Sequence, residues 1–387
     1  MMKNRKVKWL FLAGMLVCLA SLLIPAGCSP AAAPADQSAE MSRLQGEVSR
    51  LEGEVSQLQK AAAGAQPAPE KYSVKLHSMT PSATLAIGVI KDGFIPAAEA
   101  MSQGQLEFEF FEPGALVPSL EFLTALNDDV IQMAVGLSAY WESILGPTVL
   151  IGNGWPYSGE SFLDAGTWWF DMGFLETIRS IYAEQGVHYV EPYIYSPGNY
   201  IFSTKPIRTV DDFKGLKIRA PGHFGKFFGK LGASPIFMPT EEVYVGLSTG
   251  TLDAVFLAPL VDTYFMGFHE AAKYVIAPPM VTTGAIDILA GQEWWNKLPD
   301  HLKPIIQQAS AYSVERYNTK VLLVQVGVIK DMKEKGVEFI TMPDSEVAKL
   351  KQVSLALVDE LMAPDPQYAV PAGERVKQFW AMRGLLQ

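Results

Sequence analysis

One arginine near the middle of the chain has the type and position of a ligand-binding residue. The run TVDDFKGLKIRAP, residues 209–221, predicts a short strand at 217–219 that follows a glycine turn and stops at a proline. Because successive side chains of a strand alternate, Arg219 points away from the apolar layer of the sheet. Its planar guanidinium can bind a carboxylate through two parallel hydrogen bonds. An exposed arginine paired with Asp211 or Asp212 is the competing interpretation, and position alone favours it.

The sequence lacks the motifs of common enzymes and metal sites. It contains no Gly-x-Ser-x-Gly, no Walker loop and no His-Glu-x-x-His, and no two of its histidines form a ligand pair. Surface or capping roles are expected for four isolated histidines: His188, His223, His269 and His301. Of these, only His223 lies near the expected ligand crevice. We therefore expect no catalytic residue, no metal and no cofactor, with a lipid-tethered hydrolase as the remaining enzyme alternative.

Charge and cysteine content exclude two further classes. The chain has 31 Lys and Arg against 41 Asp and Glu, a formal net charge of -10. A nucleic-acid partner is not expected, because such a binder needs a positive surface. The two cysteines, Cys18 and Cys28, give neither a zinc-finger spacing nor a disulfide framework.

Strands and helices alternate through the body of the chain, whose 387 residues exceed what one hydrophobic core usually supports. The patterns predict strands at 72–77, 106–111, 130–135, 194–203 and 217–219. They predict helices at 85–101 (interrupted or kinked at Pro96), 119–127, 241–248 and 299–335. This alternation predicts an α/β fold with largely parallel sheets. Ligands of open α/β sheets bind beyond the carboxyl ends of the strands, so site residues should follow them.

The first 27 residues have the pattern of a secretory signal. Four Lys and Arg precede an uncharged apolar run at 9–24, which is shorter than the about 20 residues of a membrane span. The small residues before Cys28 resemble the lipobox of bacterial lipoproteins, although Pro25 replaces the usual leucine. Plain secretion with an incidental cysteine is the alternative. Since two or more acyl chains hold a protein stably, we expect a mature protein anchored at Cys28 rather than spanning the membrane.

A heptad pattern lies within the linker 28–70. Apolar residues spaced 3, 4, 3, 4, 3 form an a/d seam: Met41, Leu44, Val48, Leu51, Val55 and Leu58. The seam is about three heptads long, and Gly46 and Gly53 each cost about 1 kcal/mol relative to Ala in a helix. Residues 41–60 are expected either to self-associate into a homo-oligomer or to form a partly helical stalk.

A run of segments beyond residue 198 resembles a known receptor family. In order, they are NYIFSTKPI from Asn199, TVDDFKGLKIRAPG, LGASPIFMP from Leu231, EEVY and LSTGTLD ending at Asp253. Their order and spacing resemble the DctP-type solute receptor of TRAP (tripartite ATP-independent periplasmic) transporters. Looser similarity, as in EFFEPGAL, SAYW and WWNKLP, extends from Tyr72 to the C-terminus. A receptor of ABC-type importers would have similar lobes, and the motif run favours the TRAP type.

The resemblance implies a two-lobed periplasmic-binding-protein-like fold with hinge strands and a long helix that spans both lobes. Lobe I would comprise 71–198 plus about 283–322, and lobe II 199–282 plus about 323–387. The lobes would close over the ligand. A periplasmic or cell-surface, lipid-anchored receptor would then deliver its ligand to integral-membrane TRAP subunits.

The resemblance also assigns Arg219 to the ligand carboxylate, whereas Tyr244 and Asp253 are interpreted as structural. Phe256 and Leu257 replace a polar or acidic pair of many relatives, which argues against a bound cation or a dicarboxylate. The full set of expected ligand-binding residues is Arg219, Tyr140, Trp141, Asn199, Tyr200, Phe202, Phe256 and Leu257. At least two of its five aromatic members are expected in the core. One cation among apolar and aromatic walls predicts a monocarboxylate with an apolar or aromatic body.

Overall fold

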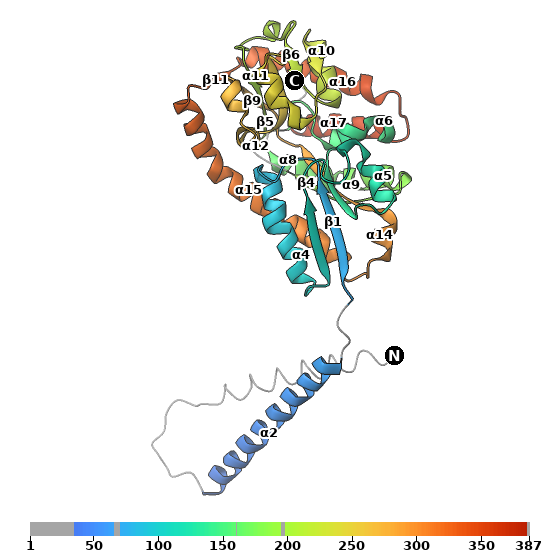
Figure 1. Ribbon diagram of the computed structural model, residues 1–387, viewed down its shortest axis with the longest axis vertical. Helices are drawn as coiled ribbons and strands as arrows, with labels where there is room; N and C mark the ends of the chain where they lie inside the picture. Colours follow the sequence, from blue (N-terminus) through green and yellow to red (C-terminus); the bar gives the residue numbers. More distant parts are fainter. Residues whose placement is uncertain (1–34, 66–69, 160, 195–197, 385–387) are drawn as a thin grey trace. The chain divides into compact units, whose positions relative to one another are not determined.

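The structure, a computed structural model, describes residues 35–65, 70–159, 161–194 and 198–384. The chain divides into two compact units, Met1–Pro69 and Glu70–Gln387 (Figure 1). The predicted signal segment and Cys28 lie outside the described residues. Within the described ranges, no helix is both long and apolar enough to span a membrane.

The described part of the first unit is one helix, α2, at Ala35–Ala65. Five apolar side chains of the predicted seam are between 48% and 60% exposed: Met41, Leu44, Val48, Leu51 and Val55. Arg50 and Glu54 form an ion pair of 3.7 Å along the helix. The helix extends beyond residues 41–60 at both ends, and self-association through this seam stays a prediction.

The second unit contains two sheets, the first with strand order β2-β1-β3-β10-β4. Its strands are β1 (Tyr72–Ser78), β2 (Leu106–Phe111), β3 (Met133–Gly136), β4 (Val187–Ile194) and β10 (Ala285–Gly291). Strand β1 is parallel to β2 and β3, whereas β10 is antiparallel to both β3 and β4.

The second sheet has the order β11-β9-β5-β8-β6-β7. Its strands are β5 (Asn199–Ser203), β6 (Lys217–Arg219), β7 (Ser234–Ile236), β8 (Ala254–Pro259), β9 (Tyr274–Val281) and β11 (Glu338–Thr341). Strand β5 is antiparallel to β8 and β9, and the other pairs are parallel. The expectation of largely parallel sheets is confirmed, because each sheet contains a single antiparallel strand, β10 in the first and β5 in the second. The prediction of one strand at 194–203 is wrong, since β4 ends at Ile194 in the first sheet and β5 begins at Asn199 in the second.

Helices lie between and around the strands. Those before β5 are α3 (Leu85–Val89), η1 (Ile90–Phe94), α4 (Ile95–Met101), η2 (Ser119–Glu121), α5 (Phe122–Asn127), η3 (Ser138–Trp141), α6 (Glu142–Leu145), α7 (Val149–Gly152), α8 (Phe162–Gly166), η4 (Thr167–Asp171) and α9 (Phe174–Glu184). Segment η1 is a π-helical turn that precedes Pro96. Proline fits the first turn of α4 because its missing N–H has no partner to lose there.

The helices after β5 are η5 (Val210–Phe213), α10 (Gly222–Lys230), η6 (Thr240–Glu242), α11 (Val243–Ser248), α12 (Leu260–Phe265), α13 (Phe268–Ala271), α14 (Gln292–Lys297), α15 (Lys303–Glu334), α16 (Asp344–Met362) and α17 (Ala369–Met382). Helix α15 has 32 residues and begins four residues later than predicted. Ile306 and Tyr317 pack in a core cluster of the first sheet, and Val328 and Met332 in one of the second. The helix therefore spans both lobes (Figure 1).

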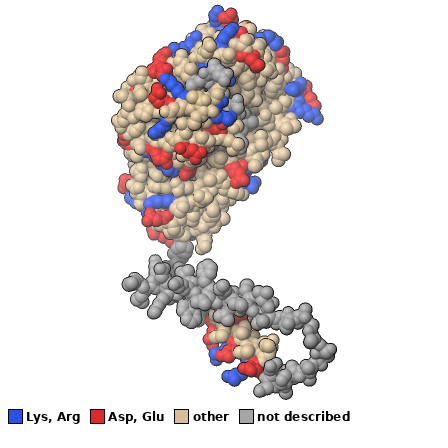
Figure 2. All heavy atoms as spheres, turned by 180° about the vertical axis from the view of Figure 1, so that it is seen from behind, with Lys and Arg blue, Asp and Glu red and all other residues tan. Residues whose placement is uncertain are grey.

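The buried apolar side chains of the described residues form three core clusters, and all three lie in the second unit. Figure 2 shows acidic and basic side chains interspersed over the visible face of this unit. On the visible face, side chains of one charge do not gather into a large patch of the kind that would bind a highly charged partner. The structure confirms a two-lobed α/β fold with a long helix across both lobes.

Candidate ligand-binding site

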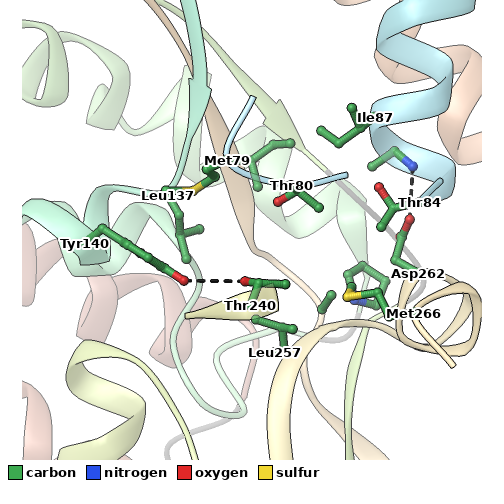
Figure 3. A pocket seen from close by; sticks show the side chains of 14 residues that line it. Met79, Thr80, Thr84, Ile87, Leu137, Tyr140, Thr240, Leu257, Asp262 and Met266 are labelled. Carbon is green, nitrogen blue, oxygen red and sulfur yellow. Dashed lines mark hydrogen bonds between the residues drawn. The ribbon is translucent and has the colours of Figure 1, made fainter. Parts of the chain in front are cut away.

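A pocket lies between the two sheets, at the carboxyl ends of β1, β3 and β8. It encloses about 610 Å³ including its mouth. The first sheet contributes Met79 and Thr80 after β1, and Leu137 and Tyr140 after β3. The second sheet contributes Leu257, Ala258 and Pro259 at the end of β8, with Thr240 beside them (Figure 3). This is where an open α/β fold places its ligand.

Arg219 lies directly behind this wall. It ends β6 and is completely buried. Its Nη2 donates to the hydroxyl of Tyr140 at 3.0 Å, its Nε to the carbonyl of Met238 at 3.0 Å and its Nη1 to that of Phe256 at 3.5 Å. A guanidinium has five N–H donors, so these three bonds leave two further N–H groups, although Arg219 itself does not line the pocket.

The charge of Arg219 is not balanced within the described part of the chain, where no carboxylate forms an ion pair with it. Burial lowers the pKa of the guanidinium, while Tyr140 and, at longer range, Glu241 raise it. The interpretation of Arg219 as an exposed partner of Asp211 or Asp212 is wrong. Asp211 instead pairs with Lys214 at 2.8 Å. A buried, unpaired cation is costly unless an anion joins it, so the site favours a negatively charged ligand.

The turn that carries Tyr140 is fixed by close packing behind it. Gly136 ends β3, and a Cβ built there would lie 2.3 Å from Cη2 of Trp141. The Trp141 ring is buried against Phe122, and its indole N–H donates to the carbonyl of Ser119 at 3.3 Å. Only glycine at position 136 leaves room for this ring.

A buried carboxylate holds the start of the same turn. Asp287 on β10 accepts hydrogen bonds from Ser138 at 2.6 Å, Tyr182 at 3.2 Å and Tyr189 at 2.9 Å. Burial raises its pKa to about 6, although these hydroxyl donors act in the opposite direction. The network connects the centre of the first sheet to the residue two positions before Tyr140.

The opposite wall contains a second buried acid that the sequence analysis did not identify. Asp262 on α12 accepts from the backbone N–H of Ala86 at 3.0 Å and from the hydroxyl of Tyr317 at 2.7 Å. Burial raises the pKa of its carboxyl group. Figure 3 shows Asp262 and Tyr140 on opposite sides of the pocket. Asp262 lies three residues after β8, a strand that no sequence pattern predicted, whereas Met79 and Thr80 directly follow the predicted strand β1 and could have been found.

The expected site residues occupy three kinds of position. Tyr140 and Leu257 line the pocket. Asn199 is buried beside it, and its Nδ2 donates to the carbonyl of Leu257 at 3.4 Å. The other four are buried or half-buried in core clusters: Trp141 and Phe256 in one, Phe202 and the half-buried Tyr200 in another.

The motif residues outside the pocket have local partners. Asp253 pairs with Lys205 at 2.9 Å and accepts from the backbone N–H of Lys217 at 3.0 Å. The exposed Tyr244 donates to Glu270 at 3.0 Å. His223 is buried beneath Trp155, which lowers its pKa to about 3. In the ranges that the structure describes, no three His, Cys, Asp or Glu residues are grouped as a metal site.

A crevice between two α/β lobes with a buried arginine behind its wall defines a two-lobed solute-binding protein. Residues 77–365 match the model of the DctP family, described as bacterial extracellular solute-binding protein, family 7. The match covers more than half of the chain, which therefore belongs to this family. It confirms the resemblance to TRAP solute receptors.

Individual relatives are more distant. A monocarboxylate 2-oxoacid-binding periplasmic protein of Nostoc is 28% identical over 213 residues, 54% of this chain and 57% of that relative's length. A sialic acid-binding periplasmic protein of Vibrio cholerae is 26% identical over 253 residues, 64% of this chain and 76% of the relative. A TRAP periplasmic solute binding protein of Pseudoalteromonas atlantica, solved with sodium and pyruvate, superposes with a TM-score of 0.73 at 22% identity. That superposition covers 82% of this chain and 96% of the other.

Proposed function

We propose that this protein is an extracytoplasmic receptor that binds a small organic acid and delivers it to the membrane subunits of a TRAP-type transporter. The observation that carries the proposal is Arg219, a completely buried cation behind the pocket wall with hydrogen-bond donors left over. A ligand carboxylate would balance its charge through charge-assisted hydrogen bonds. The output is closure of the two lobes, which a ligand favours only as far as it prefers the closed form.

We further propose that the ligand is a monocarboxylate with an apolar or aromatic body. Apolar side chains from both sheets dominate the pocket, among them Ile87, Leu137, Leu257, Met266 and Ile286. The names of the Nostoc relative, for monocarboxylate 2-oxoacids, and of the pyruvate-bound structure support a small monocarboxylate. Phe256 and Leu257 supply no carboxylate or amide to a cation, which distinguishes this site from one that binds its acid together with a metal ion.

A thermal-shift panel tests the proposal. Residues 70–387, which hold all three core clusters, are tested against small carboxylates, each beside its neutral primary amide. A ligand at 100 times its Kd adds about 2.7 kcal/mol of stability, which raises the unfolding midpoint. We expect a shift with one class of monocarboxylate and none with the matching amides. A panel without any carboxylate-specific shift would contradict the proposal.

Location and anchoring complete the proposal. The family description supports a site of action outside the cytoplasm. We propose that a lipid on Cys28 holds the protein on a membrane and that residues 41–60 act as a stalk or self-associate. The family match favours TRAP-type delivery over an ABC-type importer and over a tethered hydrolase.

The lobe boundaries are part of the same proposal. Lobe I is assigned 71–198 plus about 283–322, and lobe II 199–282 plus about 323–387. The distribution of strands supports this division, since β1–β4 and β10 form one sheet and β5–β9 and β11 the other.

A further inference from the structure

The pocket wall opposite Tyr140 contains a buried acid in an unusual position. Asp262 stands in the first turn of α12, which directly follows β8. Its side chain is only 2% exposed, and yet it lines the pocket (Figure 3). The carboxyl group thus faces a cavity that is lined mainly by apolar side chains, and any ligand in this cavity meets it.

The hydrogen-bond donors to this carboxyl group are neutral. Burial raises the pKa of Asp262, while hydrogen bonds from the hydroxyl of Tyr317 and from the backbone N–H groups of Ala86, Leu85 and Asp262 itself lower it. In the ranges that the structure describes, no Lys, Arg or His forms an ion pair with Asp262. A buried carboxylate without a cation is costly, so this wall favours a ligand group that is positively charged or donates hydrogen bonds.

The pocket therefore lies between two buried charges that the described residues do not balance. Arg219, behind the wall that carries Tyr140, has no carboxylate partner there, and Asp262 on the other side has no cationic one. Between these two polar ends the wall is apolar and includes Ile87 and Met266. A ligand with an apolar body and a complementary group at each end would balance both charges at once.

We propose that Asp262 is a specificity-determining residue, which binds an ammonium or hydroxyl group at the end of the ligand remote from its carboxylate. The inference rests on the proposed function, in which Arg219 binds the carboxylate, and adds a second polar end to the ligand. An ammonium group would form a charge-assisted hydrogen bond with Asp262, whereas a methyl group would leave its charge unbalanced. A site built around a buried polar group discriminates strongly against a ligand that lacks the matching group.

Matched sets of acids test the inference on the unmodified protein. A linear set comprises γ-aminobutyrate, γ-hydroxybutyrate and valerate, and an aromatic set comprises para-(aminomethyl)benzoate, para-(hydroxymethyl)benzoate and para-ethylbenzoate. Within a set, only the group farthest from the carboxylate changes. In isothermal titration calorimetry of residues 70–387, we expect the amino or the hydroxy acid of at least one set to bind at least about tenfold more tightly than its methyl-ended partner.

The outcomes separate this inference from the proposed function. A methyl-ended acid that binds as tightly as its partners would overturn the inference and leave the proposed function intact. The same holds if only acids without a donor at the far end bind. A protein that binds no carboxylate, in these sets or in the thermal-shift panel, would contradict the proposed function itself.

The variant D262N separates an ammonium end from a hydroxyl end. Asparagine keeps an oxygen for the N–H of Ala86 but removes the charge. Binding of an amino-ended acid should therefore weaken at least about tenfold, whereas a hydroxy-ended acid should lose only a few-fold, because the amide oxygen still accepts. The methyl-ended acid should bind as well as before or better.

The matched control is D331N. Asp331 also accepts from a tyrosine hydroxyl, that of Tyr264 at 2.8 Å, but it lies near the end of α15 and outside the pocket. Its replacement should leave the order of affinities unchanged. An unchanged order and size of preference in D262N as well would mean that Asp262 only holds the start of α3, and would overturn the inference. If D262N does not fold, the wild-type comparison decides by itself.

Discussion

The Nη2 atom of Arg219 donates a hydrogen bond to the hydroxyl of Tyr140 at 3.0 Å, and this bond joins the two sheets. Arg219 ends β6 of the second sheet, and Tyr140 lies in the turn after β3 of the first. The hydroxyl of Tyr140 lies 3.5 Å from that of Thr240, which also belongs to the second sheet's side of the pocket. The residue proposed to bind the ligand is therefore also a contact between the lobes.

Removing the Tyr140 hydroxyl should weaken ligand binding. In Y140F, the guanidinium loses a fixed partner between the lobes, which corresponds to about 1.4 kcal/mol or about tenfold in Kd. Isothermal titration calorimetry with the preferred acid measures the change. Y244F serves as control, because Tyr244 is exposed and bonds to Glu270 outside the pocket. Equal affinities of Y140F and wild type would show that the interlobe bond does not contribute.

Replacing Arg219 by methionine should not destabilise the ligand-free protein. A buried cation without a carboxylate partner costs free energy that an apolar side chain of similar length avoids. We expect R219M to leave the free energy of unfolding unchanged or to raise it by about 1 kcal/mol in urea denaturation. R179M should lower it, because Arg179 is paired with Glu191 at 3.3 Å. A loss of more than about 2 kcal/mol in R219M would show that its charge is balanced within the protein.

Adding one methyl group at Gly136 should strain the turn that carries Tyr140. The new Cβ would lie 2.3 Å from Trp141, whose ring is buried and must move. Overpacking of this kind costs about 1–3 kcal/mol, and G136A should lose that amount in chemical denaturation. In G229A, the new Cβ meets Pro235 at 3.9 Å within helix α10 and should be tolerated. Similar stabilities of both variants would contradict the packing described for Trp141.

Asp287 should give stability an unusual dependence on pH. Its pKa is about 6 in the folded protein against 3.8 for an unperturbed carboxyl, so the folded state holds the proton more tightly. This contribution is complete below about pH 4 and is lost as the pH rises through 6, by up to about 3 kcal/mol. Relative to D287N, the wild type should therefore become less stable between pH 4 and pH 7 in urea titrations. D92N, at an exposed acid, is the control; a wild-type to D287N difference that is independent of pH would contradict the assignment.

The sequence predicted those parts of the site that follow directly from strand geometry. Alternation along 217–219 and the family motif identified Arg219, and the rule that ligands bind after strands led toward the turn of Tyr140. Residue type alone could not separate wall from core, so Phe202 and Phe256 were expected in the site although both side chains are buried in core clusters. Asp262 was not identified because its place depends on α12 packing against α3 and α15, which no local pattern encodes.

The fold class and the largely parallel strand directions were predicted, but the one antiparallel strand of each sheet was not. The single strand expected at 194–203 is two strands, because the chain leaves one sheet and enters the other within this range. Alternating strands and helices suggested parallel sheets, and the antiparallel β5 and β10 could not be recognised from hydrophobic periodicity. Periodicity indicates which face of a strand is buried, not the direction of its neighbours.

The central claim is that Arg219 binds the carboxylate of the ligand. Isothermal titration calorimetry of residues 70–387, wild type and R219M, with the best acid of the thermal-shift panel tests it most directly. Loss of charge-assisted hydrogen bonds should weaken binding by at least about 100-fold, while circular dichroism shows an unchanged fold. An R219M protein that binds the same acid with wild-type affinity would contradict the claim and place the carboxylate elsewhere in the pocket.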